Sequence, residues 1–248
     1  MLAEERFSRI LSIIEAEGSA TIQELMTALD ASESTVRRDL ITMDENGLLT
    51  KVHGGAIAKR PSVSTHDEDV RNRKTMNAEQ KNAIAKYAAS LIRPDDFVYL
   101  DAGTSTEAMI PFIKTQAVFV TNAISHAKLL AEKGCRVYLL GGEFKSQTEA
   151  IVGEEAMEML SKYNFTKGFW GTNGISVSKG YSTPEIKEAM VKKYSMKNCK
   201  RCYILADASK FDQLSSVKFA DFDQATILTT ELYKPALKKY KNIVEVKE

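Results

Sequence analysis

Six short apolar runs in this sequence are each followed directly by small polar residues of the kinds that hold an anion or a sugar hydroxyl. The most informative polar segment is Gly103-Thr104-Ser105-Thr106, which follows the apolar run 97–100. Glycine lets the backbone approach an anion closely, the amides that open a following helix are free to donate, and three hydroxyl groups add further donors. The segment lacks the lysine of a nucleotide-binding P-loop. It therefore predicts a phosphate-binding turn of a different kind.

The same arrangement recurs along the chain. The other apolar runs lie at 118–120, 137–140, 168–170, 203–206 and 225–228, and they alternate with helical stretches at 105–113, 123–133, 153–162 and 184–197. Buried strands that alternate with helices predict a mostly parallel sheet, and ligands bind such sheets at the carboxyl ends of the strands. Each loop by itself is an ordinary strand-to-helix turn, but the recurrence favours a site. The candidate ligand-binding residues in these loops are Asp101, Gly103, Thr104, Ser105, Thr106, Thr121, Asn122, Gly141, Gly142, Thr172, Asn173, Gly174 and Lys210.

A second group of polar side chains lies on a short helix predicted to begin after Ser32. Val36, Leu40 and Met43 form its apolar face. At about 100° per residue, the other side presents a hydroxyl group, two guanidinium groups and one apolar residue, Ser34, Arg37, Arg38 and Ile41, and Thr35 lies at its flank. Arginine can bond both O6 and N7 of guanine, hydroxyl groups can reach bases or phosphates, and a helix N-terminus favours phosphate. This face is suited to the major groove of DNA.

Two further helices precede this one. Apolar residues recur at helical spacing in 7–14 and 22–29, and Gly18 ends the first of these helices. Thr21 and Glu24 have the spacing of a capping box for the second. The short helices predict a compact helical module at the amino end.

A small β-hairpin, or wing, is predicted after the third helix. Residues 48–52 are typical of a strand, 53–55 of a turn and 56–57 of the returning strand. Lys51 and His53 would reach the DNA backbone or the minor groove from this hairpin. The alternative is a plain three-helix bundle with a charged face, because residues 1–60 hold ten Asp and Glu against seven Lys and Arg, an unusual balance for a phosphate binder.

The chain divides into two predicted domains. Residues 1–58 form the first, the polar stretch 59–76 with Pro61 is a connecting segment, and 77–248 form an α/β domain. The second domain opens with a helix that Asn77 caps and Pro94 stops.

The composition excludes several classes of protein. Of the 248 residues, 44% are hydrophobic and 27% are charged, which is ordinary for a globular chain and unlike a fibrous or disordered one. The formal net charge of +1 does not by itself indicate nucleic-acid binding. The charged start lacks the apolar core of a signal peptide, and no apolar run approaches the roughly 20 residues that span a bilayer. We expect a cytoplasmic protein with no membrane partner.

The cysteines are too few for a disulfide framework. Cys199 and Cys202 form a CxxC pair, but two thiols cannot complete a structural zinc site, which takes four ligands, and Cys135 is the only other thiol. We expect reduced cysteines beside a buried strand, with no metal and no cofactor.

Both halves of the chain resemble a known family. The run 32–40, followed by Gly47-Leu48 and 53–56, is similar to the DNA-binding signature of the DeoR-type bacterial sugar-operon repressors. The second half resembles the sensor domain of the same family through 101–104, Thr121-Asn122, 140–142, 171–174 and 206–211. Within the family, the sequence is most similar to the fructose-operon repressors of Gram-positive bacteria.

The resemblance implies a fold and a function. The expected fold class is α/β, with a small N-terminal winged helix-turn-helix and a C-terminal mostly parallel α/β sensor domain resembling ribose-5-phosphate isomerase. The expected partners are double-stranded operator DNA and a phosphosugar effector, with fructose 1-phosphate as the first choice. The expected assembly is a homodimer or homotetramer. The resemblance implies that Ser34, Thr35, Arg37 and Arg38 bind DNA, and Lys51 and His53 of the predicted hairpin complete the expected DNA-binding residues.

The main alternative is a phosphosugar isomerase with an appended DNA-binding domain. Lys179 and Glu185 match the lysine and glutamate of the isomerase pattern, but 171–175 replaces its acidic motif, so two carboxylates are missing. We therefore predict a pocket that binds without turnover, in which Lys179, Glu185 and Lys210 hold sugar hydroxyls or phosphate. Lys187 and the pair Lys192-Lys193 are predicted to be solvated surface charges. A third possibility is a DNA-binding scaffold with a vestigial, empty pocket.

Overall fold

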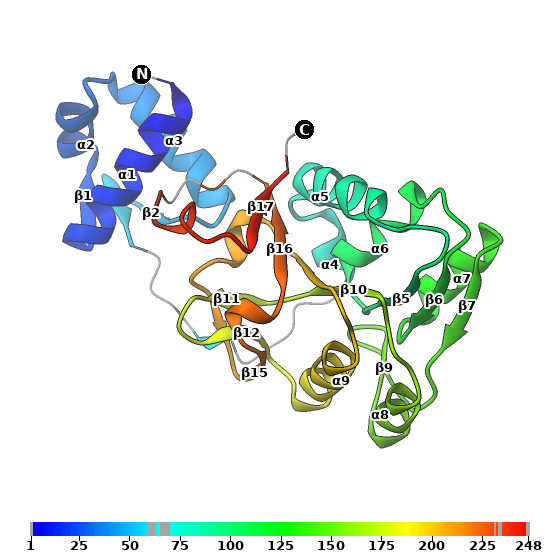
Figure 1. Cartoon of the computed structure of the whole chain (residues 1–248). Coiled ribbons are helices and arrows are strands. Elements are labelled where there is room, and N and C mark those ends of the chain that lie inside the picture. Colours follow the sequence, from blue (N-terminus) through cyan, green and yellow to red (C-terminus); the bar gives the residue numbers. More distant parts are fainter. Residues whose placement is uncertain (1, 59–62, 65–69, 231, 233–234, 247–248) are drawn as a thin grey trace. The chain divides into compact units, whose positions relative to one another are not determined.

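A computed structural model of the chain describes residues 2–58, 63–64, 70–230, 232 and 235–246. The chain forms two compact units. The first unit comprises Met1–Pro61 and Glu231–Lys241, and the second comprises Ser62–Thr230 and Asn242–Glu248. Figure 1 shows the helices and strands of both units. Among the helices that the structure describes, none combines the length and apolar character needed to cross a bilayer.

The first unit contains the three predicted helices, α1 (Ala3–Glu17), α2 (Ile22–Leu29) and α3 (Glu33–Glu45). Gly18 ends α1 with φ +80°, a left-handed conformation that glycine adopts without strain. Thr21 and Glu24 form the predicted capping box, and the Ser32 hydroxyl accepts a hydrogen bond from the Thr35 amide at 3.4 Å. The local capping signals therefore set all three helix boundaries as predicted.

A three-stranded antiparallel sheet completes this unit. The predicted hairpin consists of β2 (Thr50–Val52) and β3 (Gly55–Ile57), and β1 (Ser19–Thr21) pairs with the other side of β3. We did not predict β1, because three residues between two helices carry no alternating pattern. The close pairing explains Gly55, since a Cβ atom there would lie 2.3 Å from the carbonyl oxygen of Ala20.

The core of the first unit lies between its helices and sheet. An ion pair at its edge joins α1 to α3, with Arg6 Nε 2.6 Å from Asp39 Oδ2 and a second Arg6 nitrogen 3.0 Å from Asp39 Oδ1. Asp39 is only 5% exposed, so this two-point contact compensates the burial of its charge. The buried hydrophobic residues of the cluster are Phe7, Ile10, Leu11, Ile14, Ala20, Ile22, Leu25, Leu29, Val36, Leu40, Met43, Leu49 and Ala56.

The second unit is built on a seven-stranded, fully parallel sheet, which confirms the predicted fold class. The sheet order is β17-β16-β13-β10-β5-β6-β7. From β5 the chain adds β6 and β7 on one side, then returns to β10 and adds β13, β16 and β17 on the other side. The strand order therefore reverses between β5 and β10. In chain order, the strands are β5 (Phe97–Leu100), β6 (Val118–Thr121), β7 (Arg136–Leu139), β10 (Lys167–Gly171), β13 (Cys202–Leu205), β16 (Thr226–Thr229) and β17 (Ile243–Glu245).

Helices cover both faces of this sheet. Figure 1 shows α5 and α6 on one side of the sheet and α8 and α9 on the other. The predicted helix at 105–113 is instead one turn of α-helix, α6, followed by a 3-10 turn. The helices are α4 (Val70–Thr75), α5 (Ala78–Ser90), α6 (Thr104–Glu107), η1 (Ile110–Phe112), α7 (Ile124–Glu132), α8 (Glu154–Ser161) and α9 (Ile186–Lys197), with short 3-10 turns η2 (Ala208–Lys210), η3 (Phe222–Gln224) and, in the first unit, η4 (Pro235–Leu237).

The segment predicted to connect the domains is partly helical. Residues 70–75 form α4, whereas 59–62 and 65–69 lie outside the described residues. The Lys74 ammonium group lies 2.9 Å from Glu107 Oε1, which ties α4 to α6. The second half of the predicted linker is therefore part of the second unit.

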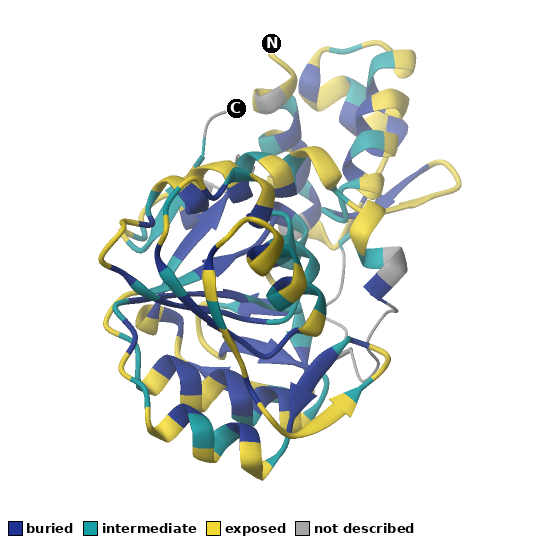
Figure 2. Ribbon diagram, turned by 90° about the vertical axis from the view of Figure 1, so that its right-hand side faces the viewer, coloured by how far each residue is buried: buried dark blue, intermediate teal, exposed yellow. Residues whose placement is uncertain are grey.

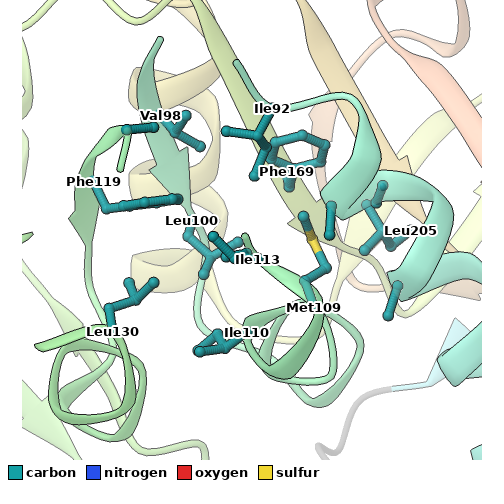
Figure 3. Close-up of a cluster of buried hydrophobic side chains, with 14 of the residues drawn as sticks. Ile92, Val98, Leu100, Met109, Ile110, Ile113, Phe119, Leu130, Phe169 and Leu205 are labelled. Atoms are coloured by element: carbon teal, nitrogen blue, oxygen red, sulfur yellow. The ribbon is translucent and has the colours of Figure 1, made fainter. Parts of the chain in front are cut away.

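The main core of the second unit lies between the sheet and α5, η1 and α7. Val98, Leu100 and Phe119 point from β5 and β6 toward Met109 and Ile110, as Figure 3 shows. All five side chains are at most 1% exposed. On the other side of the sheet, the Trp170 indole donates to the Ser195 hydroxyl of α9 at 2.9 Å. Most strand residues are buried in Figure 2, which fixes the carboxyl-end loops on a rigid support.

Three small accessory sheets were not predicted. One is antiparallel and contains β11 (Gly174–Ser176), β12 (Gly180–Thr183) and β15 (Val217–Ala220). The hairpin of β8 (Glu143–Lys145) and β9 (Ala150–Val152) forms the second, and β4 (Val63–Ser64) pairs with β14 (Leu214–Ser215) in the third. Strands of two to four residues provide too few alternations to be detected from sequence.

Candidate DNA-binding face and effector pocket

The exposed face of α3 carries the side chains that the sequence placed there. Ser34, Arg37 and Arg38 are exposed and Ile41 is 45% exposed, whereas the opposite face is fully buried. The Arg37 guanidinium group pairs with Glu33 one turn earlier at 2.7 Å, and both side chains are more than half exposed. Among the described residues, Arg38 has no ion-pair or hydrogen-bond partner. Both guanidinium groups are therefore accessible from solvent.

Hydroxyl groups cluster at the beginning of α3. The Ser32 hydroxyl lies 3.1 Å from that of Ser34 and 2.9 Å from that of Thr35. In the hairpin that follows, Lys51 and His53 are both exposed. The Lys51 amide donates to Asp44 Oδ1 at 3.2 Å, which fastens the hairpin to the end of α3. The helix and the wing thus form one supported surface with hydroxyl, guanidinium and ammonium groups.

A pocket in the second unit lies at the carboxyl ends of β5, β10 and β13, where the strand order reverses. Residues 102–105, 171–173 and 205–207 line it from the three strand ends. Arg73, Met76, Asn77 and Lys81 close it from α4 and α5, and Thr148, Glu188, Lys192 and Lys210 complete it. The predicted ligand edge of the sheet therefore contains a pocket.

Six of the predicted effector residues line this pocket: Gly103, Thr104, Ser105, Thr172, Asn173 and Lys210. Among the described residues, the backbone amides of Thr104 and Ser105 donate to no protein acceptor. Because α6 has only four residues, these amides act as individual donors and not as the end of a large helix dipole. The loop offers a ligand two free N–H groups and two hydroxyl groups.

Four other predicted residues support the pocket loop or its neighbours. The Thr106 hydroxyl donates to Asp101 O at 2.6 Å and to Gly103 O at 2.8 Å. The Asn122 side-chain oxygen accepts from the Ala102 amide at 2.8 Å. Thr121 lies at the end of the adjacent strand, where its hydroxyl accepts from the Ala123 amide. The side chains of Thr106, Thr121 and Asn122 are buried, and Asp101 reaches the pocket only through its ion pair with a lining lysine.

The remaining predicted effector residues lie elsewhere. Gly141 and Gly142 follow β7 and are exposed, Gly174 is buried in β11, and Lys179 is exposed in the turn before β12. Glu185 is the N-cap of α9, and its carboxylate accepts hydrogen bonds from the backbone amides of Lys187 and Glu188. None of the five predicted residues is among the lining residues of the pocket.

One prediction is wrong, because Lys192 is buried and not a solvated surface charge. Its side chain is 7% exposed, and its ammonium group pairs with the carboxylate of Asp101, which is 2% exposed, and also donates to Gly171 O at 3.2 Å. Burial raises the pKa of Asp101, and the charge of Lys192 counteracts part of that rise. The error arose because α9 is buried on two sides, so its polar residues do not mark its solvent face. Lys187 and Lys193 are exposed, as predicted.

Glu188 is a further charged residue beside the buried Lys192–Asp101 ion pair. It accepts from the Thr148 hydroxyl at 2.5 Å and from the Lys145 ammonium group at 2.9 Å. Although burial raises the pKa of Glu188, the charge of Lys192 and these two hydrogen bonds hold it below its usual value. The sequence contained one usable signal, since Glu188, Lys192 and Ser195 recur at the spacing of one helix face.

Two cations from α4 and α5 were also not predicted. The Lys81 ammonium group donates to the backbone oxygen of Arg73, and Lys81 is 8% exposed. The Arg73 Nε is buried and has no hydrogen-bond partner among the described residues. With Lys192 and Lys210, the lining contains four cations against the two carboxylates Glu188 and Asp207. The pocket therefore favours an anionic ligand.

His126 lies behind the Gly103 loop without adding charge to it. The side chain is 1% exposed, and burial lowers its pKa to about 3, although a backbone hydrogen bond with Gly103 opposes this shift. Its Nδ1 atom has no hydrogen-bond partner among the described residues. The imidazole is therefore neutral at physiological pH.

The fold and these two surfaces define a winged helix-turn-helix protein with an α/β sensor domain. The family model of the DeoR-like helix-turn-helix domain matches residues 6–61, and that of the DeoR C terminal sensor domain matches residues 76–232. The chain belongs to the DeoR family of transcriptional regulators.

Similar proteins cover nearly the whole chain. FruR of Bacillus subtilis, an uncharacterized helix-turn-helix regulator, is 42% identical over 100% of this chain and 98% of its own length. GlcR, a transcriptional repressor of the same organism, is 32% identical over 93% of this chain and 89% of its own length. The lactose phosphotransferase system repressor of Staphylococcus aureus is 33% identical over 92% of this chain and 91% of its own length. The solved structures include ribose 5-phosphate isomerase A from Neisseria gonorrhoeae, with 13% identity, a TM-score of 0.40, and 53% and 52% of the two chains covered.

Proposed function

We propose that this protein is a repressor of a carbohydrate operon that leaves its operator when a phosphorylated sugar fills the pocket of the second unit. The observation on which this rests is the convergence of free backbone amides and four cationic side chains, Arg73, Lys81, Lys192 and Lys210, on one pocket. The fold places that pocket in the same chain as an exposed, arginine-bearing helix. A ligand-controlled regulator needs at least an effector site and a DNA-binding surface, and this chain would supply both.

The DNA half of the proposal rests on the exposed face of α3. Arg37 and Arg38 would contact guanine or phosphate in the major groove, with Ser34 and Thr35 at the helix start bonding the backbone. Lys51 and His53 on the hairpin would contact neighbouring phosphates. Because residues 1–60 hold ten acidic side chains against seven basic ones, these few cations must provide the local attraction.

In the pocket, we assign the phosphate to the Gly103–Ser105 loop. Two free amides, the hydroxyl groups of Thr104 and Ser105, and the cations of Arg73 and Lys210 complement a group that carries about two negative charges at neutral pH. Asn173, Asp207 and Glu188 then provide oxygen acceptors for the sugar hydroxyls. A neutral sugar would leave the charges of Arg73 and Lys210 without a counter-charge, so the phosphate group is required for binding in this proposal.

The pocket binds its ligand without turnover in this proposal. An aldose–ketose isomerase needs a carboxylate base free to move a proton between adjacent carbons. Glu188 is held by donors from Lys145 and Thr148, and Glu185 caps a helix and does not line the pocket. The named relatives are regulators. Purified protein that interconverted aldose and ketose phosphates at enzymatic rates would contradict the sensor assignment.

The size of the pocket suggests how the ligand changes the protein. Its volume is about 60 Å³, well below the roughly 300–1,000 Å³ of typical ligand pockets, so we expect a hexose phosphate to enter only if a wall moves. We assign the movement to α4 and to Met76, because this wall directly follows the segment that leads from the first unit along the chain. A ligand that binds only the widened state shifts the equilibrium toward it.

The assembly is proposed to be a homodimer or homotetramer in the cytoplasm. Two winged modules would bind operator half-sites separated by one DNA turn or a multiple of it. Gel filtration of the protein with and without DNA tests this arrangement, and a monomer in both conditions would contradict it.

Fructose 1-phosphate is the first candidate effector, on the basis of the 42% identity to FruR. The test is fluorescence anisotropy of labelled DNA from the gene's own upstream region, titrated with fructose 1-phosphate, fructose 6-phosphate, fructose 1,6-bisphosphate and tagatose 6-phosphate. Each compound is paired with its unphosphorylated parent as a control. Release by one phosphosugar but not by its parent supports the proposal. Bound DNA that none of them releases rejects these effectors and leaves the DNA-binding half standing.

A further inference from the structure

A second pocket of the same unit contains both cysteines of the CxxC pair. It has a volume of about 710 Å³ and lies between the end of α9 and β15. Cys199 and Cys202 both line it and are partly exposed. Its lining shares no residue with the effector pocket, so the proposed sugar site does not account for it.

The two thiols occupy one turn between α9 and β13. Cys202 Sγ lies 3.9 Å from Cys199 O and 3.7 Å from Met196 O, and Cys199 Sγ lies 3.3 Å from Arg201 O. These backbone contacts hold both sulfur atoms at the same turn. The hydrogen bond between the two thiols lowers the pKa of Cys202 and raises that of Cys199, so Cys202 is the better nucleophile of the pair.

The charges around the thiols are mainly positive. Lys193, Lys197 and Lys200 line the pocket, are exposed, and have no ion-pair partner among the described residues. A fourth lysine, Lys218, pairs with Asp221, which is the one carboxylate of the lining. Three uncompensated ammonium groups attract an anion and favour a thiolate over a thiol.

We propose that Cys199 and Cys202 form a thiol–disulfide exchange site whose lysine-lined pocket takes an anionic low-molecular-weight disulfide. A zinc site does not account for the pair, because no cluster of three or more His, Cys, Asp or Glu side chains suited to a metal occurs in the part of the chain that the structure describes. A pocket of this volume is in the range that encloses a small organic ligand.

The chemistry balances in two exchange steps. The Cys202 thiolate attacks one sulfur of the disulfide, whose S–S bond breaks, and one thiolate leaves and takes up a proton from water. Cys199 then loses its proton and attacks Cys202 Sγ in the mixed disulfide, which expels the second thiolate. The two cysteines are oxidised to one disulfide, and the small disulfide is reduced to two thiols.

The test uses the full-length reduced protein and two probes, oxidised glutathione, which carries carboxylates, and the neutral hydroxyethyl disulfide. Intact-mass and peptide-mass measurements follow the reaction, and each rate is divided by the rate for the urea-unfolded chain with the same probe. We expect a Cys199–Cys202 disulfide and a normalised rate at least about tenfold higher for glutathione. Buried Cys135, whose pKa is raised by burial, should stay reduced.

Variants distinguish the proposed roles. Cys199→Ser should stop the reaction at a mixed disulfide on Cys202, and Cys202→Ser should slow the first step. Lys197→Gln with Lys200→Gln should remove most of the preference for glutathione, whereas Lys179→Gln, outside the pocket, should not. Equal normalised rates for the two probes, or failure of the native protein to form the Cys199–Cys202 disulfide, would overturn the proposal. Neither readout depends on operator DNA or on a sugar effector.

Discussion

The exposed face of α3 and the pocket of the second unit both present cations to a proposed anionic partner, but they hold those cations in opposite ways. Arg37 and Arg38 lie in solvent, and within the described part of the chain the only ion pair there is the exposed one with Glu33. In the pocket, Lys192 is buried against Asp101 and stabilises Glu188. The difference separates two kinds of site, one in which charges can change without disturbing the fold and one in which charge and fold are coupled.

The largest expected effect is on the exposed face. We expect Arg37→Ala combined with Arg38→Ala to weaken specific operator binding by up to about 6 kcal/mol, at about 1–3 kcal/mol for each contact. Thermal unfolding of the same variant should be unchanged, because neither side chain packs in the core. Anisotropy with operator DNA and circular dichroism measure the two quantities, with Lys179→Ala as the control. Retained specific binding would show that α3 is not the recognition helix.

The buried ion pair should give the opposite result. Lys192→Met leaves the carboxylate of Asp101 without its partner and removes one of the charges that stabilise Glu188, and we expect the free energy of unfolding to fall by about 3–5 kcal/mol. Urea titration followed by the fluorescence of Trp170, the only tryptophan, reports on this unit. The double variant with Asp101→Asn should recover part of the loss. A loss below about 1 kcal/mol would show that this pair contributes no more to stability than a typical surface salt bridge.

A substitution in the Gly103–Ser105 loop tests the proposed effector binding without a change in fold. Ser105→Asp puts a negative charge beside the free amides, and we expect the effector concentration for half-release of DNA to rise about 100-fold, or about 2.7 kcal/mol. Operator affinity without effector should be unchanged. Ser105→Ala, which keeps the amide and adds no charge, is the matched control and should change induction less. Equal induction in wild type and Ser105→Asp would reject the phosphate assignment.

Burial of His126 predicts a pH dependence confined to the second unit. Its folded pKa of about 3 lies below the unfolded value of 6.5, so between these pH values the unfolded chain binds one more proton. Stability therefore falls as the pH decreases from 6.5 toward 3, by about 1.4 kcal/mol for each pH unit. Urea titrations at pH 5, 6 and 7 should show this slope in the wild type relative to His126→Gln. Parallel curves for the two proteins would mean that the imidazole is solvated.

The smallest effect concerns the exposed pair on α3. Glu33→Gln removes the partner of Arg37, and we expect a change in unfolding free energy below about 0.5 kcal/mol. Operator affinity should increase slightly, because one repulsive carboxylate disappears and Arg37 is released. Circular dichroism melts and anisotropy at low salt measure the two changes. A stability loss above about 1 kcal/mol would indicate that this pair supports the fold.

The difference between the two regions also explains which predictions succeeded. Capping residues such as Gly18, Thr21 and Ser32 act on the backbone within one turn, so they can be recognised without knowing the fold. The apolar runs likewise marked six of the seven strands of the central sheet. The accessory sheets and β1 were missed, since strands of two to four residues are defined by their partners and not by their own pattern.

Local signals in the sequence by themselves determined the polar face of α3, the strands of the parallel sheet and the position of the Gly103–Ser105 loop. Each depends on residues within a turn or a strand of one another, where propensity and periodicity act. Only the tertiary structure decided that Lys192 faces Asp101, 91 positions earlier, and that Arg73 of the predicted linker lines the same pocket. A buried charge is stable only beside its partner, and the partner is brought near by the fold and not by the sequence around it.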